Sequence, residues 1–342
     1  MLRVILNPDG RLPPPRVAGM MLVGRIRRAV DESSRSDRIT QMSPSTTSEN
    51  GRSTPASHKG HARFDVAPYL KPGAGIAPVH STARGALFAD DCLNVLPRLV
   101  DSCVDTVFAD PPFNLGKEYG AGTDDLRPDD AYLAWCRRWL GECVRVLRPG
   151  GSIFVYNLPR WNILLGAHLT ELGLTFRHWI AVEMSASLPI AGRLHPSHYS
   201  LLYYSKGKPA TFRRIRTPVQ TCRHCGGEVK DYGGHRRALH PNGITLKDVW
   251  TDIPPVRHRK FKSGRRKANA LSTKLLDRVI EMSTVPGDLV LDPFGGSGTT
   301  FRVCEDRHRH WIGVEIDHAP QIVERLETNE IHPHRNEDAV EE

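Results

Sequence analysis

The pattern of apolar and polar positions predicts alternating strands and helices from about residue 86 to residue 327. Short apolar runs indicate buried strands, and apolar residues three and four positions apart indicate helices with one buried face. Strands are predicted at residues 86–89, 104–109, 152–156, 176–183, 199–205, 288–291 and 311–315. Helices are predicted at residues 93–100, 133–147, 161–172, 272–283, 299–306 and 319–326. Such alternation is typical of an α/β fold, a mainly parallel sheet covered by helices on both faces.

The predicted core is interrupted by an insertion and flanked by segments without periodicity. Residues 1–80 are rich in Pro, Gly, Ser, Thr and Arg, which indicates a disordered basic tail that ends in a Pro/Gly linker. Residues 81–211 and 269–328 carry the two halves of the core. Between them, residues 212–268 form a basic insertion, and residues 329–342 are a polar tail.

Composition limits the classes of protein to which the chain can belong. With 342 residues, 39% of them hydrophobic and 25% charged, it is long enough for one large globular domain with an insertion. No apolar run approaches the roughly 18 residues that a membrane helix needs, and we find no pattern of a secretory signal. Seven unevenly spaced cysteines argue against a disulfide framework and favour a reducing cytoplasm.

Positive charge is concentrated in the insertion. The chain has a formal net charge of +9, but residues 212–267 alone hold 15 Lys and Arg against four Asp and Glu. A local excess of this size favours a polyanion such as double-stranded DNA as partner, although a solvated charged face is the common alternative. Tyr232 and Trp250 are candidates for stacking on bases or sugars. The residues expected to neutralise phosphates are Arg236, Arg237, Arg257, Arg259, Lys260, Lys262, Arg265, Arg266 and Lys267.

The stretch Asp110-Pro111-Pro112-Phe113 directly follows a predicted strand. Its two prolines restrict the backbone and hold Asp110 in an extended conformation. The Asp110 carboxylate and the Pro111 carbonyl can then accept hydrogen bonds from one planar amine, while Phe113 offers a face for stacking. These features suit a nucleobase with an exocyclic amino group; a proline-rich turn in which Asp110 only caps a loop is the alternative.

A second motif, residues 292–299, joins a predicted strand to a predicted helix. Its glycines let the backbone approach a ligand closely, and the helix N-terminus offers unpaired N–H groups. The Asp292 carboxylate suits a ligand amine, and Glu315, 19 residues after Gly296 at the end of the next strand, suits ribose hydroxyls. S-adenosylmethionine combines an amino-acid head with a ribose, so we expect it as the cofactor.

Together the two motifs closely resemble those of the DNA amino-methyltransferases, which methylate adenine N6 or cytosine N4. The resemblance covers residues 86–327 apart from the insertion and implies a Rossmann-like methyltransferase sheet. The catalytic motif precedes the cofactor motif, which is like the circularly permuted beta subgroup. In that family the Asp-Pro-Pro-Phe/Tyr turn binds the target amine. The residues to which this role carries over are Asp110, Pro111, Pro112 and Phe113.

The same resemblance implies a set of cofactor-binding residues. Asp90-Asp91-Cys92 looks like the family's Gly-Asp-Cys, which puts Asp91 near the cofactor adenine, and residues 195–199 are similar to the family's Arg-Pro-Thr-His-Glu segment. Ser272-Thr273-Lys274 departs from the family's His-Pro-Thr-Gln-Lys-Pro, but Lys274 matches its lysine at the methionine end of the cofactor. The other residues implied are Asp292, Pro293, Phe294, Gly295, Gly296, Ser297, Gly298, Thr299 and Glu315.

The residues and the resemblance predict the same reaction. An exocyclic amine is a poor nucleophile because its lone pair is delocalised into the ring; acceptors at Asp110 and Pro111 favour a pyramidal nitrogen whose lone pair faces the methyl group. A paired base cannot reach this turn, so we expect it to flip out, stack on Phe113 and undergo direct methylation. Because Asp rather than Ser opens the motif, adenine N6 is predicted, with cytosine N4 as the alternative.

The insertion also contains candidate zinc ligands. Cys222, Cys225, His235 and His240 have ligand types and a spacing compatible with a tetrahedral zinc site, with His224 as a competing ligand. A metal would replace the apolar core that this segment lacks. Two free cysteines and solvated histidines are the alternative.

Other functions are consistent with these motifs. One alternative is a DNA-binding zinc protein with a degenerate methyltransferase core, which would bind the cofactor without transferring methyl groups. Another is an enzyme of the same kind that acts on RNA instead of DNA. A site-specific enzyme of a restriction-modification system would act beside a partner endonuclease, as a monomer or a homodimer. The intact motifs favour the enzyme.

Overall fold

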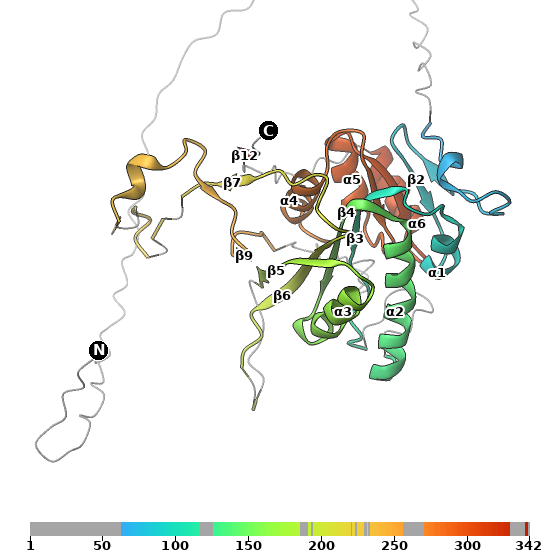
Figure 1. Ribbon diagram of the computed structural model, residues 1–342, viewed down its shortest axis with the longest axis horizontal. Helices are drawn as coiled ribbons and strands as arrows, with labels where there is room; N and C mark the ends of the chain where they lie inside the picture. The colour runs from blue at the N-terminus through green and yellow to red at the C-terminus, as the bar shows by residue number, and fades with distance from the viewer. Residues whose placement is uncertain are drawn as a thin grey trace, which may run out of the picture. The chain divides into compact units, whose positions relative to one another are not determined.

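The structure is a computed structural model. In the part of the chain that it describes, the main sheet has nine strands and is drawn in Figure 1. The described residues are 63–116, 126–184, 191–192, 194–219, 221–222, 224–228, 231, 233–255, 270–328 and 339–340. They belong to one compact unit, Lys59–Glu342. The strands stand in the order β1 (His80–Ser81), β2 (Gly85–Phe88), β11 (His310–Val314), β10 (Leu289–Asp292), β3 (Val104–Ala109), β4 (Leu147–Asn157), β6 (His198–Ser205), β5 (Thr175–Glu183) and β9 (Val249–Trp250).

Five neighbouring strands of this sheet, from β2 to β4, run parallel to one another. β6 is antiparallel to both β4 and β5, so the sheet is mixed rather than wholly parallel. Strands that pair in parallel cannot be joined by tight hairpins and need longer crossover connections. The carboxyl ends of the five parallel strands all lie at one edge of the sheet, which we term the carboxyl edge.

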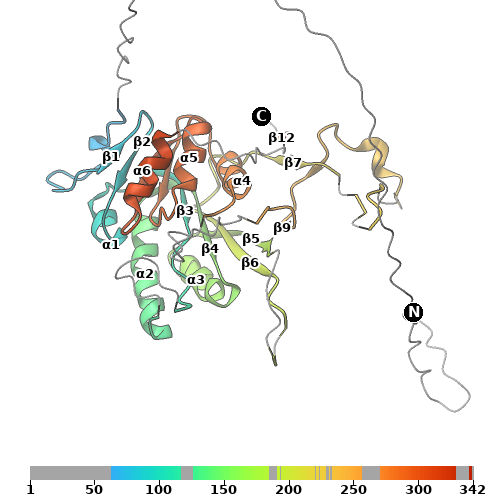
Figure 2. The same ribbon diagram turned by 180° about the vertical axis from the view of Figure 1, so that it is seen from behind.

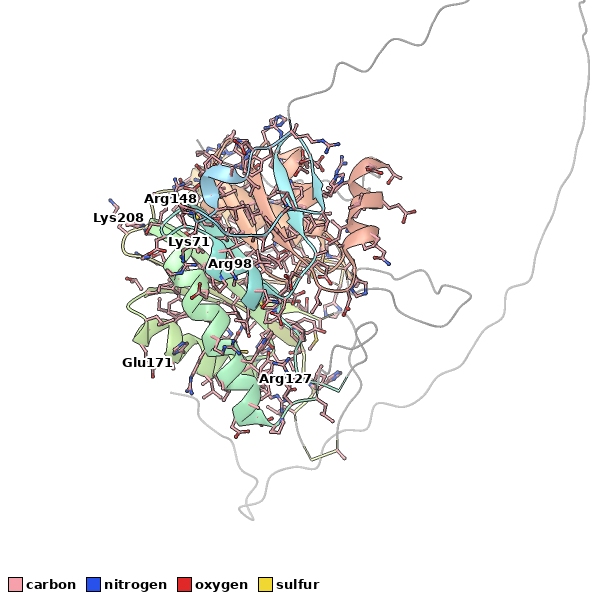
Figure 3. All side chains as sticks on the ribbon, turned by 90° about the vertical axis from the view of Figure 1, so that its right-hand side faces the viewer. Lys71, Arg98, Arg127, Arg148, Glu171 and Lys208 are labelled. Atoms are coloured by element: carbon pink, nitrogen blue, oxygen red, sulfur yellow. The ribbon has the colours of Figure 1, made fainter. Side chains whose placement is uncertain are left out.

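Helices cover both faces of the sheet. One face carries α1 (Cys92–Val95), α2 (Asp129–Val146) and α3 (Pro159–Glu171). The other face carries α4 (Thr273–Ser283), α5 (Thr299–Asp306) and α6 (Ala319–Glu327), which lie toward the viewer in Figure 2. Strand residues alternate between the two cores, since Leu289 and Leu291 pack with α1 to α3 whereas Val290 packs with α4 to α6. Figure 3 shows α2 along its face, with Arg127 and Arg148 near its two ends.

The α/β fold predicted from periodicity is confirmed, with small shifts at the ends of most elements. The largest shift concerns β4, which begins at Leu147 rather than at residue 152. The Pro-Gly-Gly sequence at 149–151 forms an irregular part of this strand, with φ of +83° at Gly150 and a register shift relative to β3. It is held there because the Gly150 N–H donates to Lys206 O (2.7 Å) and the Lys206 N–H donates to Gly151 O (2.9 Å). None of the described helices combines the length and the apolar character that crossing a membrane requires.

The described structure begins at Arg63, within the segment predicted to be a tail and linker. Val66 is buried in the core beside α1, and Phe64 stacks on Tyr69 with ring centroids 5.6 Å apart. The Val100 N–H donates to Tyr69 O (3.0 Å), which ties this segment to the core. Residues 63–80 are therefore packed despite their Pro and Gly content, because a few apolar side chains anchor them. Residues 1–62 lie outside the described part.

The basic insertion joins the main sheet through β9. The Ala181 N–H of β5 donates to Asp248 O (2.8 Å), and Trp250 of β9 is 2% exposed. The Trp250 indole N–H donates to Lys247 O (2.7 Å), and the guanidinium carbon of Arg278 lies 5.2 Å from the centre of its ring. Trp250 is thus a core residue, and the prediction that it stacks on nucleic acid is wrong, because strand pairing buries its ring.

Ion pairs also connect the insertion to α4. Asp252 accepts hydrogen bonds from both terminal nitrogens of Arg278 (2.8 and 2.6 Å) and lies 2.8 Å from the Lys274 ammonium. A second sheet in this region consists of β12 (Ala339–Val340), β7 (Ile215–Thr217) and β8 (Ile244–Thr245), with a short 3-10 helix, η3 (His235–Ala238), between β7 and β8 in the chain. Tyr232 and the predicted phosphate-binding residues from 257 to 267 lie outside the described residues.

Gly313 of β11 offers a test of the core on the α5 side. A Cβ atom at this position would lie 2.2 Å from Cζ of Phe301, so Gly313→Ala should lower the free energy of unfolding by about 1–3 kcal/mol. Gly141 of α2 has open space around the same atom, and Gly141→Ala should instead stabilise by about 0.5–1 kcal/mol. Urea unfolding of both variants checks this packing; an unchanged midpoint for Gly313→Ala would contradict it.

Candidate active site

The carboxyl edge gathers acidic residues from four neighbouring strands. β10 ends in Asp292, while Asp110, Glu315 and Asp91 follow shortly after β3, β11 and β2. The strand order β2-β11-β10-β3 sets these residues along the edge in the order Asp91, Glu315, Asp292 and Asp110. Residues far apart in the sequence thus form one row of carboxyl groups, at the place where sheets of this kind bind ligands.

The two sequence motifs meet because β3 and β10 are paired neighbours. Asp292 is 2% exposed, and burial raises its pKa to about 7, although hydrogen bonds from Thr300 and from the Phe294 N–H oppose this rise. Burial also raises the pKa of Asp110 well above its usual range, and the negative charge of Asp292 raises it further. Two adjacent carboxyl groups with raised pKa values favour an amine or a cation as the ligand.

The turn at Asp110 is held by buried side chains. The Tyr132 hydroxyl donates to Pro112 O (2.7 Å), and the Trp161 indole N–H donates to Phe113 O (2.9 Å). The Asn157 amide donates to the Tyr132 hydroxyl (3.0 Å), which fixes that ring in turn. The carbonyls of the last two residues of the turn are therefore fixed by the protein itself.

The first two residues of the turn present acceptors to the carboxyl edge. Among the described residues, nothing donates a hydrogen bond to the Asp110 carboxyl group or to the Pro111 carbonyl. Asp110 as a residue keeps some exposure to solvent, although its carboxyl group is buried enough to raise its pKa. A group with two N–H donors, such as an exocyclic amine, would satisfy both acceptors at once.

Three aromatic rings stand beside these acceptors. The Phe113 ring centre lies 6.1 Å from that of Tyr156 and 5.7 Å from that of Tyr199, and the two tyrosine rings are 5.2 Å apart. Burial raises the pKa of both tyrosines, and the charge of Asp110 raises each pKa further, so both lie close to it. No role for Tyr156 was indicated by the sequence, and Tyr199 stood out only as the last residue of the segment 195–199 that is similar to the family's Arg-Pro-Thr-His-Glu. The available signal was an aromatic residue near the end of β4 and another near the start of β6, which strand pairing brings together.

The turn between β10 and α5 places glycine where the backbone is left-handed, with φ of +53° at Gly296 and +76° at Gly298. Its aromatic residue, Phe294, packs edge-on against Trp139 of α2 at 5.1 Å. Phe294 therefore packs the turn against α2. This packing accounts for an aromatic residue at this position without any contact to a ligand.

The hydroxyl groups of this turn face α6. Ser297 and Thr299 place their hydroxyl oxygens 3.1 Å apart. Arg325 of α6 donates to Ser297 O (2.8 Å) and to the Thr299 hydroxyl (3.1 Å). These contacts order the turn from its outer side.

Glu315 braces the same turn from β11. It accepts hydrogen bonds from the N–H groups of Gly296 (2.6 Å), Asp317 (3.0 Å) and His318 (3.2 Å). Burial raises its pKa, but hydrogen bonds from His318 and the two other N–H groups outweigh burial, so the pKa lies below its usual value. Glu315 is thus ionised, and its Oε2 accepts only the Gly296 N–H among the described residues. A lone-pair position remains there for a hydroxyl group.

The other predicted cofactor residues lie at the N-terminal ends of helices. Asp91 caps α1 by accepting the Leu93 N–H (2.8 Å), and Lys274, in the first turn of α4, pairs with Asp252. Ser272 precedes α4 and is 8% exposed, and its hydroxyl has no hydrogen-bond partner among the described residues. A buried, unpaired hydroxyl beside a helix N-terminus fits a carboxylate. The carboxyl edge therefore offers partners for each polar part of S-adenosylmethionine.

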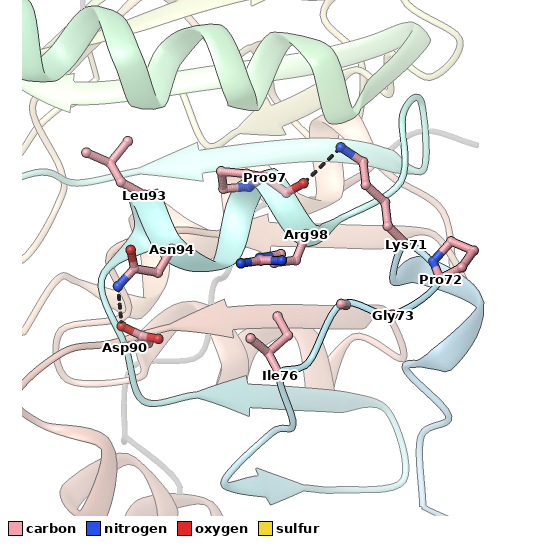
Figure 4. A pocket seen from close by; sticks show the side chains of 10 residues that line it. Lys71, Pro72, Gly73, Ile76, Asp90, Leu93, Asn94, Pro97 and Arg98 are labelled. Atoms are coloured by element: carbon pink, nitrogen blue, oxygen red, sulfur yellow. Dashed lines mark hydrogen bonds between the residues drawn. The ribbon is translucent and has the colours of Figure 1, made fainter.

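A separate cavity of about 530 Å³ has Asp90 in its lining but neither Asp110 nor Asp292; Figure 4 shows it from close by. It is an open groove whose polar groups pair locally: the Asn94 amide donates to Asp90, and the Lys71 ammonium donates to Pro97 O, both at 2.8 Å. Its lining comes from the loop after η1 (Ala67–Tyr69), from α1 and from η2 (Leu96–Arg98).

The predicted zinc ligands do not form a site in the described residues. Cys222 and Cys225 share one turn, in which the Cys222 N–H donates to Gly227 O (2.7 Å). His240 uses Nδ1 to accept the Asn242 N–H (3.1 Å), and the side chain of His235 lies outside the described part. No group of three metal-binding side chains occurs in the described ranges, so the zinc prediction is not supported and enters no step below.

The chain matches a family model described as DNA methylase, of the N6/N4 type, over residues 104–324. This chain belongs to the N6/N4 DNA methylase family. The match starts at the first residue of β3 and ends within α6, so it includes both motifs. The resemblance to the amino-methyltransferases that these motifs indicated is confirmed.

Two relatives align with most of this chain. The Type II methyltransferase M.BamHI of Bacillus amyloliquefaciens is 54% identical over 256 residues, 75% of this chain but only 60% of that protein. The Type II methyltransferase M.HpaI of Haemophilus parainfluenzae is 30% identical over 250 residues, 71% of this chain and 74% of that protein. Among solved structures, the PvuII DNA methyltransferase (cytosine-N4-specific) shares the fold, with a TM-score of 0.54 at 19% identity over 77% of this chain and 92% of that one.

The buried charge of Asp292 predicts how stability depends on pH. Its pKa is about 7 in the folded protein and about 3.9 in an unfolded chain. Between these values the unfolded chain has lost a proton that the folded protein keeps, so the free energy of unfolding should fall as pH rises. The expected loss is on the order of 4 kcal/mol. Denaturant titrations should show that the free energy of unfolding depends less on pH in Asp292→Asn than in the wild type. The same pH dependence in both proteins would contradict a raised pKa at Asp292.

Proposed function

We propose that this chain transfers a methyl group from S-adenosylmethionine to an exocyclic amino group of a base in double-stranded DNA. The observation that carries the proposal is the pairing of β3 with β10, which sets the acceptors of the Asp110 turn beside Asp292 at the carboxyl edge. Membership of the N6/N4 DNA methylase family supports the same reaction.

The acidic residues along the carboxyl edge follow the same order as the parts of the cofactor that they would bind. Asp91 at β2 suits the adenine end, Glu315 at β11 the ribose hydroxyls, and Asp292 at β10 the ammonium of the amino-acid head. The unpaired Ser272 hydroxyl suits its carboxylate. Lys274, which pairs with Asp252, would add positive charge from the first turn of the same helix. When bound, S-adenosylmethionine supplies an electrophilic methyl group on a sulfonium. The next strand along the edge is β3, so Asp110 adjoins the position where transfer would occur.

The Asp110 turn would activate the amine by orienting it. The two N–H groups of the amine donate to the Asp110 carboxylate and to the Pro111 carbonyl, which leaves the nitrogen lone pair facing the methyl carbon. In the transfer, the nitrogen would form its bond to the methyl carbon as the bond from that carbon to the sulfonium breaks, with its electron pair going to the sulfur. Asp110, whose pKa is raised, can hold the proton that the nitrogen then releases.

Aromatic side chains would hold the flipped base in place. Phe113, Tyr156 and Tyr199 surround the acceptors with apolar faces on which a base can stack. The insertion joins the sheet through β9, beyond β4, β6 and β5, and so lies on the target side of β3 rather than on the cofactor side. This position suits contacts with the duplex around the flipped base. The two relatives are named Type II methyltransferases, which supports a role in a restriction-modification system. A cytoplasmic location is part of the same proposal.

The base that is methylated is the finer part of the proposal. Asp110 as the first residue of the turn favours adenine N6. Cytosine N4 is the second candidate, because the same two acceptors fit its amine and the PvuII enzyme of the same fold is named cytosine-N4-specific. Incubation with labelled S-adenosylmethionine and duplex DNA, followed by digestion to nucleosides, separates N6-methyladenine from N4-methylcytosine. If the protein binds the cofactor but transfers no label to DNA, the proposal of an enzyme is refuted. A parallel sample with RNA tests whether RNA is the substrate instead.

Replacing the target-binding carboxylate should stop the reaction. Asp110→Ala removes one of the two acceptors for the amine, so methyl transfer should fall by at least about 1,000-fold. Affinity for S-adenosylmethionine should stay within a few-fold, because the partners of the cofactor are unchanged. Glu171→Gln, an exposed carboxylate of α3, is the matched control and should behave as the wild type. Loss of cofactor binding in Asp110→Ala would instead show that the two sites are misassigned.

Cofactor binding should weaken in acid. A protonated Asp292 cannot pair with the ammonium group, so affinity for S-adenosylmethionine should fall about tenfold per pH unit below its pKa of about 7. Asp292→Asn should bind weakly at every pH and lack this dependence. Calorimetric titration across this range checks both, and a variant that keeps the wild-type pH profile would assign the effect to another group.

A further inference from the structure

Two arginines outside the basic insertion flank the Asp110 turn. Arg127 lies two residues before α2, with Pro128 between them, and Arg160 lies in the first turn of α3. α2 follows β3 in the chain and α3 follows β4, so both helices begin at the carboxyl edge. Figure 3 shows Arg127 at the end of α2 that lies away from Lys71, Arg98 and Arg148. The two arginines are therefore on the same edge as the acceptors for the amine.

Asn114, the residue after Phe113, connects the two arginines. Its side-chain amide donates to Arg127 O and its side-chain oxygen accepts the Arg127 N–H, both at 2.8 Å. Its carbonyl accepts a hydrogen bond from Arg160 (3.4 Å). Asn114 is 6% exposed and has a left-handed backbone with φ of +56°, a conformation that asparagine tolerates. The positions of both arginines are thus tied to the turn that would bind the target.

A row of aromatic rings supports the two guanidinium groups. The guanidinium carbon of Arg127 lies 4.9 Å from the ring centre of Trp135, and that of Arg160 lies 4.3 Å from the ring centre of Trp161. Tyr132 stands between these rings, 5.8 Å from Trp135 and 4.6 Å from Trp161. Stacking of this kind limits the conformations of an arginine side chain while its N–H groups stay available. Tyr132 is also the residue that donates to Pro112 O.

Neither arginine is neutralised by a carboxylate in the described part of the chain. By contrast, Arg145 of α2 is paired with Asp101 and Glu142. Asp129 and Asp130 follow Arg127 in the chain but form no ion pair with it. Two fixed, unpaired guanidinium groups beside a nucleobase site have the right chemistry for phosphodiester oxygens.

We propose that Arg127 and Arg160 form a second DNA-backbone site that binds the phosphates on either side of the flipped nucleotide. This inference rests on the proposed function, since it takes DNA as the substrate. A base that leaves the stack exposes its flanking phosphates, and cations held by the target turn itself can stabilise that arrangement. The insertion, on the β9 side of the sheet, then needs to bind only the surrounding duplex.

Salt dependence of DNA binding gives the decisive test. Each phosphate contact adds about 0.9 to the slope of log K against log [salt] for duplex DNA. Arg127→Gln and Arg160→Gln should each lower this slope by about one, and the double variant by about two. Fluorescence anisotropy with a labelled duplex at several salt concentrations measures the slope without requiring catalysis.

Control variants separate charge from folding. Arg98→Gln removes an exposed arginine of η2 that has no carboxylate partner among the described residues, and its slope should equal that of the wild type. Arg127→Lys keeps the charge and should restore the slope even though it loses the planar stack. A fall in affinity with an unchanged slope in the double variant would mean a packing role and would overturn the proposal.

The same measurements distinguish this inference from the proposed function. Wild-type protein that methylates DNA, with a double variant whose slope is unchanged, would refute only the second backbone site. Wild-type protein that neither binds nor methylates DNA would refute both. Cofactor affinity should be unaltered in all of these variants.

Discussion

The parallel pairing of β3 with β10 is the interaction on which the site depends. Hydrogen bonds between the two strands place the turn after one beside the last residue of the other, although the residues are separated by most of the core and the whole insertion. Closed packing by α1 to α3 on one face and α4 to α6 on the other leaves Asp292 almost without water. The electrostatic character of the site follows from these two facts.

A buried carboxyl group without a cation is unfavourable when ionised. Burial therefore raises the pKa of Asp292 to about 7, and the charge of Asp292 also raises the pKa of Asp110. A ligand with an ammonium group would relieve the cost of ionising Asp292, so the burial that makes this carboxylate unfavourable would also favour such a ligand. Glu315 differs because a hydrogen bond from the His318 side chain and the N–H groups of Asp317 and Gly296 lower its pKa and keep it ionised.

Side chains that carry no motif hold the motifs in place. Tyr132, Asn157 and Trp161 fix the target turn from α2, β4 and α3, and Phe294 fastens the glycine-rich turn to α2 through Trp139. On the other side, the bidentate pair of Asp252 with Arg278 binds the end of the insertion to α4. A fully buried guanidinium needs such a partner, so this link is part of the core rather than a surface contact.

The sequence by itself determined the strand and helix periods, the two motifs and the family, because each is written in residues that are neighbours along the chain. It also predicted that both motifs end parallel strands, which is enough to expect one ligand site. Only the tertiary structure placed Tyr156 and Tyr199 beside Asp110, buried Trp250, paired Lys274 with Asp252 and joined Arg127 to Arg160 through Asn114. These contacts join residues that are distant in the sequence. Periodicity shows which face of an element is buried, but the partner that covers it depends on how the strands pair and the helices pack.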